Sequence, residues 1–278
     1  MTFVEKIMMP SLDKYCANPK KFSLKEHDPK DKSERSGSKE QNELDLKQLA
    51  TEINALQNIL YAEGQRKVLL VLQGMDASGK DGTVKHVFNE SDPLGIRLAS
   101  FKAPTSEELA HDYLWRIHQQ VPRQGELVVF NRSHYEDVLI TKVHNWIDEA
   151  ECERRYAQIN DFERLLTETG TTMVKCFLHI SKDEQKTRMQ ERLDDPTKAW
   201  KFNTGDLKER ALWPQYMQAY EQAIKSTSTE QAPWYIVPAD SKTNRNLLIS
   251  RLLLKALKDM KLKYPATPAE YKSIVIAD

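Results

Sequence analysis

The segment Gly74-Met-Asp-Ala-Ser-Gly79-Lys80 constrains the fold of this chain most strongly, because it satisfies the pattern G-x-x-x-x-G-K. It directly follows an unbroken apolar run, Lys67 to Gln73, which predicts a strand buried on both faces of a parallel sheet. Glycines let the backbone curl so that successive N–H groups and the next helix N-terminus face one anion. A chance glycine turn is the alternative, but the flanking strand and helix favour a phosphate loop, defined here as residues 74–82.

Further apolar runs follow this first strand, separated by helical patterns. They are Ile96 to Phe101, Leu127 to Phe130, Met173 to Ile180 and Trp234 to Val237. Thr105-x-x-Glu108 and Ser181-x-x-Glu184 are capping-box signatures that begin two of the helices. Strands that alternate with helices imply right-handed crossovers. The prediction is a P-loop kinase-like, doubly wound α/β fold with about five parallel strands, helices on both faces and a helical lid.

The predicted organisation is a polar N-terminal arm at residues 1–42, one kinase-like domain at 43–265 and a C-terminal tail at 266–278. The arm is too poor in apolar residues to build a core of its own. From Leu46 to Leu60 apolar residues recur at three- and four-residue steps, which predicts a helix that ends at Gly64. This helix is expected to pack on the domain or on a second subunit.

Charge and cysteine content exclude several classes of function. The 41 Lys and Arg residues balance 41 Asp and Glu residues, so the total charge favours neither nucleic acid nor membrane as a partner. The three cysteines, Cys16, Cys152 and Cys176, have the spacing of neither a disulfide framework nor a metal cluster, and no apolar run approaches the roughly twenty residues that span a bilayer. We expect a cytoplasmic protein whose anion site is a local concentration of basic residues.

Two carboxylates distinguish this phosphate loop from the common nucleotide-triphosphatase form. Asp81 stands where Ser or Thr would ligate Mg²⁺, and Asp76 lies inside the predicted cradle. A carboxylate among phosphate oxygens is repulsive unless a divalent cation lies between them. Asp76 is therefore the first candidate for holding Mg²⁺, the alternative being that it caps a turn and faces water.

A second polar cluster, Asn131 to Asp137, follows the apolar run at Leu127 to Phe130. Ligands of open parallel sheets collect beyond the carboxyl ends of strands, so this cluster and the phosphate loop are expected to share one crevice. Arg132 is suited to clamp phosphate oxygens, with an ion pair to Glu136 as the alternative. His134 is expected to pack or to form hydrogen bonds, because phosphoryl transfer needs little general base.

A basic lid is predicted at about residues 186–206. Arg188 and Arg192 lie four residues apart, hence on one face of a helix that begins near Lys182. A segment with Pro and Gly interrupts this helix before Asp206, which is expected to cap the next one. Closure over phosphates would exclude water and bring arginines to the developing charge. The alternative is a solvated helix face paired with neighbouring acids.

Three motifs together resemble polyphosphate kinase family 2, from roughly Leu46 to Leu257: Gly74-Met-Asp-Ala-Ser-Gly-Lys-Asp-Gly, Phe130-Asn-Arg-Ser-His-Tyr-Glu-Asp and Trp200-Lys-Phe. The resemblance implies a P-loop kinase fold with a lid, Mg²⁺ as cofactor and reversible phosphate transfer between inorganic polyphosphate and the adenine nucleotides AMP, ADP and ATP. It also implies a homo-oligomer, dimer or tetramer. Members that act mainly on nucleoside diphosphates carry Asp at the position of Asn131 and Asn at that of Glu136. This chain has the opposite pair, Asn131 and Glu136, and in this respect resembles the class III branch, whose members accept AMP as well as ADP.

The resemblance also implies roles for individual residues. The catalytic set is Asp76, Lys80, Arg132, Glu136, Arg188 and Arg192. Mg²⁺ would be held by Asp76 with Glu136 or Asp137. The expected phosphate contacts are Gly74, Ala77, Ser78, Gly79, Lys80, Asp81, Gly82 and Lys201. The basic residues Lys85, Lys102 and Arg116 either extend the groove or are ordinary solvated charges.

Two rival functions remain open at this point. One is an ATP-dependent small-molecule kinase of the nucleoside-monophosphate type on the same fold. The other is a non-catalytic phosphate or nucleotide sensor that uses the loop and lid as a switch. A carboxylate at position 76, inside the loop, favours metal-assisted chemistry over sensing alone.

Overall fold

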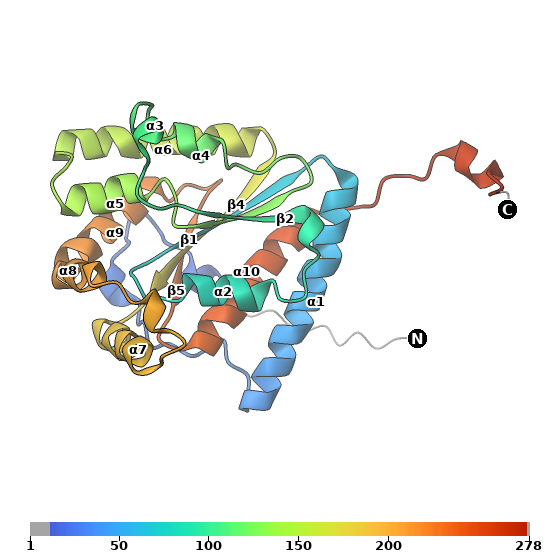
Figure 1. Ribbon diagram of the computed structural model, residues 1–278. Helices are drawn as coiled ribbons and strands as arrows, with labels where there is room; N and C mark the ends of the chain where they lie inside the picture. Colours follow the sequence, from blue (N-terminus) through green and yellow to red (C-terminus); the bar gives the residue numbers. More distant parts are fainter. Residues whose placement is uncertain (1–11, 277–278) are drawn as a thin grey trace.

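The computed structural model describes residues 12–276 and contains a five-stranded parallel sheet in the order β2-β3-β1-β4-β5 (Figure 1). The strands are β1 Lys67–Gln73, β2 Ile96–Ser100, β3 Leu127–Asn131, β4 Thr171–His179 and β5 Trp234–Pro238. Each apolar run expected to form a strand does so, and the α/β prediction is confirmed. The strand order changes direction at β1, which pairs with β3 on one side and with β4 on the other. A crevice for ligands is therefore expected at the carboxyl end of β1.

Helices cover both faces of the sheet (Figure 1). One face carries α1 Lys39–Glu63, α2 Lys80–Val87 and α10 Lys242–Asp259. The other face carries α5 Glu136–Val143, α6 Glu149–Glu168 and α9 Trp213–Thr227. The shorter helices are α3 Ser106–Leu109, α4 Trp115–His118, α7 Lys182–Asp194 and α8 Gly205–Ala211, with 3-10 turns at Asp13–Tyr15, Leu24–Glu26, Pro93–Gly95, Ala199–Lys201 and Ala269–Ser273. Among the described residues, no helix combines the length and apolarity needed to cross a bilayer.

The helix ends follow the local sequence. Helix α1 ends where predicted, because Gly64 adopts the left-handed conformation with φ 63° and donates its N–H to Leu60 O. It begins at Lys39, seven residues before the apolar stripe, where the Ser38 side chain accepts from Gln41 N. The capping box at Thr105 is complete, with both reciprocal hydrogen bonds formed.

The segment before α1 lies against the domain. Its apolar side chains Leu12, Tyr15, Ala17, Phe22 and Leu24 are buried in the same core cluster as the sheet. This segment has no core of its own, since its side chains complete one built by the rest of the chain. The remainder of the predicted arm, residues 1–11, lies outside the described residues, as do residues 277–278 of the tail. The described tail, which ends at 276, projects away from the body of the protein (red, Figure 1).

Candidate active site

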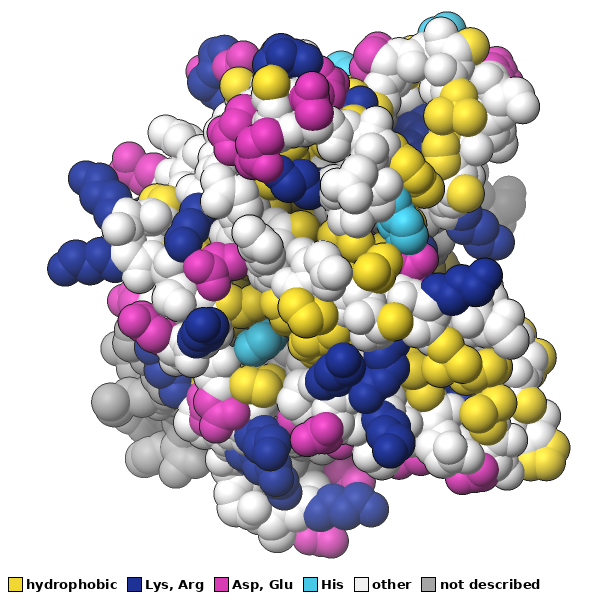
Figure 2. Space-filling view, turned by 90° about the vertical axis from the view of Figure 1, so that its left-hand side faces the viewer, with side chains coloured by type: hydrophobic (Ala, Val, Ile, Leu, Met, Phe, Trp, Pro, Cys, Tyr) yellow, Lys and Arg dark blue, Asp and Glu magenta, His cyan; other side chains and the backbone are white. Residues whose placement is uncertain are grey.

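A cleft of about 680 Å³ lies at the carboxyl ends of the central strands, where the crevice is expected. Its lining is strongly basic, with nine Lys and Arg side chains against four carboxylates. The basic side chains are Lys80, Lys102, Arg132, Arg188, Arg192, Lys198, Lys201, Lys242 and Arg245, and the acidic ones are Asp76, Asp81, Glu191 and Asp206. Figure 2 shows Lys and Arg side chains (dark blue) gathered in groups on the lower half of the face that carries α7 and α8. A protein without net charge thus concentrates positive charge at one place.

The phosphate loop curls at its glycines. Gly74 has φ 154°, and a Cβ there would lie 2.8 Å from Leu178 O, while Gly79 has φ 104°. Ala77 also takes a positive φ of 62°, which is strained for a residue with a Cβ. The buried Lys80 ammonium lies within the curl and donates to Gly74 O at 2.7 Å and to Met75 O at 3.3 Å. Burial lowers the pKa of Lys80, and Asp76 partly opposes this change.

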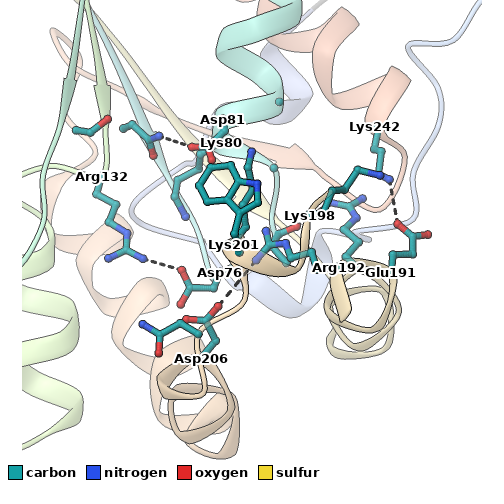
Figure 3. Close-up of a pocket in the computed structure, with 18 of the residues that line it drawn as sticks. Asp76, Lys80, Asp81, Arg132, Glu191, Arg192, Lys198, Lys201, Asp206 and Lys242 are labelled. Atoms are coloured by element: carbon teal, nitrogen blue, oxygen red, sulfur yellow. Dashed lines mark hydrogen bonds and ion pairs between the residues drawn. The ribbon is translucent and has the colours of Figure 1, made fainter. Parts of the chain in front are cut away.

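Asp76 faces the cleft and is bonded to a cation that comes just after the neighbouring strand β3 (Figure 3). Arg132 Nη2 donates to Asp76 Oδ1 at 2.6 Å. Arg132 follows β3 directly and has a positive φ of 62°, with its N–H bonded to Leu72 O. Burial would raise the pKa of Asp76, but Lys80, Arg132 and Arg192 together hold it below its usual value. Asp76 is therefore a carboxylate at neutral pH, and its side chain points to the arginine rather than capping a turn.

The predicted metal ligands do not form one cluster. Among residues 12–276, no group of three or more His, Cys, Asp and Glu side chains is arranged to hold a metal ion. Glu136 accepts from Gln73 Nε2 at 3.0 Å, whereas the partly buried carboxylate of Asp137 turns to Arg116 at 3.5 Å. Burial raises the pKa of Asp137. Mg²⁺ usually takes one or two protein carboxylates and completes its shell with phosphates and water, so Asp76 at the loop fits such an ion without a protein cage.

The end of β3 is tied to the phosphate loop. Asn131 Nδ2 donates to Asp81 Oδ1 at 2.6 Å, which joins the two polar clusters that the sequence predicts in one crevice. Lys102 lines the cleft, but Lys85 and Arg116 do not. Arg116 is buried and donates to Lys102 O at 2.8 Å as well as pairing with Asp137. Of the three residues considered for extending the groove, the structure brings only Lys102 to it.

Arg188, on α7, donates its hydrogen bonds to other groups of the protein. Its buried guanidinium donates through Nη1 to Ala77 O and Ser78 O at 3.0 and 3.1 Å. Nη2 donates to Ala239 O and Asp240 O at 2.7 and 2.8 Å, and Nε donates to Glu184 Oε1 at 2.7 Å. Although it lines the cleft, this arginine therefore holds the strained loop in shape. A direct contact with phosphate stays a prediction.

The lid lies over the same cleft (Figure 3). Arg192 Nη1 is 3.9 Å from Asp206 Oδ2, and Lys201 Nζ lies 5.1 Å from the centroid of the Trp200 ring. The expectation that Asp206 caps a helix is wrong, because it lies inside the first turn of α8, whose N-cap is Thr204. It instead serves as the acidic partner of Arg192. The lid therefore presents guanidinium and ammonium groups to the cleft, with two acids, Glu191 and Asp206, among them.

Two residues that shape the loop, Gln185 and Arg245, were not predicted from the sequence. Gln185, on α7, donates through Nε2 to Asp76 O at 2.9 Å. Arg245, in the first turn of α10, donates through Nη1 to Ser78 O at 3.1 Å and lines the cleft. A cation in the first turn of a helix opposes the helix dipole, and this was the signal in the sequence that could have marked Arg245.

His134 belongs to a buried network beneath the site. Its Nε2 lies 3.2 Å from Glu163 Oε1, which also accepts from the Tyr135 hydroxyl at 2.7 Å. Lys175 Nζ donates to Glu163 Oε2 at 2.6 Å and to Thr227 O at 2.8 Å. The network anchors the turn after Arg132 from below, and His134 takes the hydrogen-bonding role that was expected of it.

Comparison with known proteins agrees with this geometry. The family model described as Polyphosphate kinase 2 matches residues 36–265. The chain belongs to the polyphosphate kinase 2 family. It is 53% identical, over 95% of its length and all of the relative's, to the AMP/ADP-polyphosphate phosphotransferase of Meiothermus ruber. It is 44% identical to the ADP-polyphosphate phosphotransferase of Rhodopseudomonas palustris, covering 80% of this chain and 82% of that one.

A solved structure of the same family confirms the fold. The crystal structure of polyphosphate kinase 2 from Arthrobacter aurescens TC1 superposes with a TM-score of 0.87 at 50% sequence identity. The match covers 91% of this chain and 92% of that chain. The P-loop kinase-like fold and the membership of polyphosphate kinase 2, both predicted from three motifs, are confirmed.

Proposed function

We propose that this chain transfers the terminal phosphoryl group of inorganic polyphosphate to AMP and to ADP, reversibly and in the cytoplasm. The observation that carries the proposal is the cleft itself, in which nine basic side chains surround a phosphate loop. A linear polyphosphate is a flexible polyanion, and a groove of Lys and Arg binds it through charge and bidentate hydrogen bonds. The Meiothermus ruber relative is an AMP/ADP-polyphosphate phosphotransferase, which supports AMP as an acceptor beside ADP.

The chemistry is an in-line displacement at phosphorus. A terminal phosphate oxygen of the nucleotide attacks the end phosphorus of the polyphosphate, the P–O bond to the rest of the chain breaks, and the shortened polyphosphate leaves with the electron pair. The ammonium of Lys80 and the guanidinium of Arg132 both lie near Asp76, where they would stabilise charge on the transferred group. Because the attacking oxygen is already ionised at neutral pH, no general base is needed.

The cofactor we propose is Mg²⁺. Asp76 would hold it together with phosphate oxygens, and Asp206 would be the second acid nearby. Burial raises the pKa of Asp206, and the neighbouring carboxylate of Asp76 raises it further. When bound, the ion would neutralise phosphate charge that otherwise repels Asp76. A role for Glu136 or Asp137 as a further ligand stays a prediction.

One assay tests the proposal against its rivals. The protein is incubated with AMP, polyphosphate and Mg²⁺, and the nucleotides are separated by chromatography. We expect ADP first and then ATP. An ATP-dependent kinase would instead form ADP from ATP and an acceptor without polyphosphate, and a sensor would bind the ligands without forming any product.

Matched variants make the assay specific to the cleft. Lys80→Ala removes the ammonium inside the loop and should abolish turnover, while circular dichroism checks that the fold is kept. Lys85→Ala removes the same charge from the exposed side of α2, outside the cleft, and should retain the wild-type rate. Equal rates in both variants would remove the loop from the mechanism.

We also propose a homo-oligomer, a dimer or a tetramer. Helix α1 exposes Leu44 and Tyr61, at 62% and 50% of their surface, beyond the stripe that packs on the domain. Apolar side chains exposed on one long helix suit contact with a second copy. Light scattering coupled to size-exclusion chromatography gives the mass directly, and a monomer mass would contradict this assignment.

A further inference from the structure

Arg245 packs directly against the phosphate loop. Only 2% of the residue is exposed. Nη1 donates to Ser78 O at 3.1 Å, and Nε and Nη2 donate to Oδ1 of the neighbouring Asn246 at 3.2 and 2.9 Å. A Cβ at Gly79 would collide with the guanidinium, and one at Gly82 would lie 3.3 Å from Nη2. The absence of a side chain at these two glycines thus leaves room for the guanidinium, in addition to allowing the loop to curl.

The charge of Arg245 has no acidic partner among the hydrogen bonds and ion pairs of residues 12–276. Arg188, its neighbour at the loop, pairs with Glu184, and the buried Arg116 pairs with Asp137. Burial lowers the pKa of Arg245 to about 9, and Arg188 adds to this effect, so the guanidinium remains protonated at neutral pH. A buried cation without an anion is costly, because nothing replaces the hydration that it loses.

The position of Arg245 at the start of α10 also favours an anion. Arg245 lies in the first turn of α10, an 18-residue helix whose N-terminus carries partial positive charge. The backbone of the phosphate loop and the start of α2 lie against it. Arg245 also belongs to the lining of the cleft, so its charge acts on whatever occupies the loop.

We propose that Arg245 is a positioning residue of the phosphate site: it fixes the loop through the Ser78 carbonyl and holds a positive charge that only the bound phosphate chain neutralises. This inference rests on the proposed function, because it takes polyphosphate as the ligand. It adds to the phosphate site a cation that lies more than 160 residues from the phosphate loop in the sequence. It also explains why the protein keeps a buried charge that destabilises it before ligand binds.

Two substitutions separate charge from shape. Arg245→Met removes the charge and keeps much of the side-chain length, whereas Arg245→Lys keeps the charge and loses the planar fork of donors. Lys255→Met is the matched control, because it removes one charge from the exposed surface of the same helix. Each protein is titrated with tripolyphosphate and Mg²⁺ by calorimetry, and its thermal unfolding is followed with and without tripolyphosphate.

We expect unliganded Arg245→Met to unfold at the wild-type temperature or above it. Its affinity for tripolyphosphate should fall by about tenfold or more, and most of the ligand-induced rise in Tm should be lost. Arg245→Lys should keep its affinity within about threefold of wild type, since the charge remains. Lys255→Met should match the wild type in both measurements.

The outcomes distinguish this inference from the proposed function. A wild-type protein that does not bind tripolyphosphate would contradict the proposed function itself. Wild-type binding that Arg245→Met leaves unchanged would overturn only the role of Arg245. A lower unfolding temperature for unliganded Arg245→Met, with an unchanged ligand-induced rise, would show an arginine that merely packs the loop, and would also overturn it. If Arg245→Met does not fold, Arg245→Lys decides, because a tenfold loss there would mean that charge is not what matters.

Discussion

Arg188 and Arg192 lie one turn apart on α7, yet their surroundings predict opposite consequences for their substitution. Arg188→Met would remove five hydrogen bonds, four of them to backbone carbonyls. Ser78 O keeps a donor from Arg245, so three carbonyls, those of residues 77, 239 and 240, lose the donor that holds them. Each buried polar group left without a partner costs about 1–3 kcal/mol, and relaxation reduces the sum. We expect the free energy of unfolding to fall by about 3–5 kcal/mol.

Arg192→Met provides the contrast within the same helix. The Arg192 side chain is 26% exposed, and its closest approach to Asp206 is 3.9 Å. Such a pair contributes about 0–1 kcal/mol, so the stability of this variant should be close to that of the wild type. Phosphoryl transfer should nevertheless slow markedly, because the guanidinium faces the cleft.

Urea unfolding followed by circular dichroism measures both variants, and the slope m shows whether unfolding remains comparable. As a control, the activity of each variant with AMP and polyphosphate is measured at a temperature where that variant is fully folded. Wild-type stability in Arg188→Met, combined with lost binding of polyphosphate, would refute the reasoning. It would mean that the guanidinium contacts phosphate instead of holding the loop.

Three further expectations follow from charged groups of the protein. Glu163→Gln should lower the free energy of unfolding by about 3–5 kcal/mol, because Lys175 stays buried without its anion. The double variant Glu163→Gln/Lys175→Met should recover part of the lost stability, and a Glu163→Gln variant as stable as the wild type would contradict the expectation. The affinity for tripolyphosphate should fall as the pH rises through the pKa of Lys80, which is lowered from the usual 10.5, since only the charged ammonium attracts the anion. Calorimetric titrations at a series of alkaline pH values measure this affinity, and an affinity that does not change with pH would contradict the expectation. The pKa of Asp76 is lowered in the folded protein, so its pairing with Arg132 contributes full stability at pH values above the ordinary pKa of 3.8 and loses it as the pH falls through the lower folded pKa. The difference in unfolding free energy between wild type and Asp76→Asn should therefore shrink in acid. A difference that stays constant with pH would argue against the pair.

The sequence predicted the elements that carry the site because their signals are local. The run from Lys67 to Gln73 and the glycines after it lie within one short segment, and the structure places strand, curl and helix there as expected. The Gly64 end of α1 is equally local, since it depends on one left-handed residue. Parallel pairing then brings Asn131 beside Leu72, which is how two separate motifs come to share one crevice.

The direction in which each side chain points could not be predicted from the sequence pattern. Helical spacing puts Arg188 and Arg192 on one face, but it does not tell whether a guanidinium meets phosphate or the carbonyls of the loop. Glu136 and Asp137 are adjacent in a helix, so they point about 100° apart and cannot both face one ion. Arg245 reaches the loop only through the packing of α10 on α2, a contact between distant segments. The burial of Phe22 likewise depends on a surface supplied by the rest of the chain.

The most direct test of the central claim is a transfer experiment with labelled donor. Polyphosphate carrying ³²P is mixed with unlabelled AMP, Mg²⁺ and the protein, and the position of the label in the product is determined. We expect ³²P in the β-phosphate of ADP, formed by the wild type and not by Lys80→Ala. Unlabelled AMP that persists while the polyphosphate remains intact, or label released only as inorganic phosphate, would contradict it.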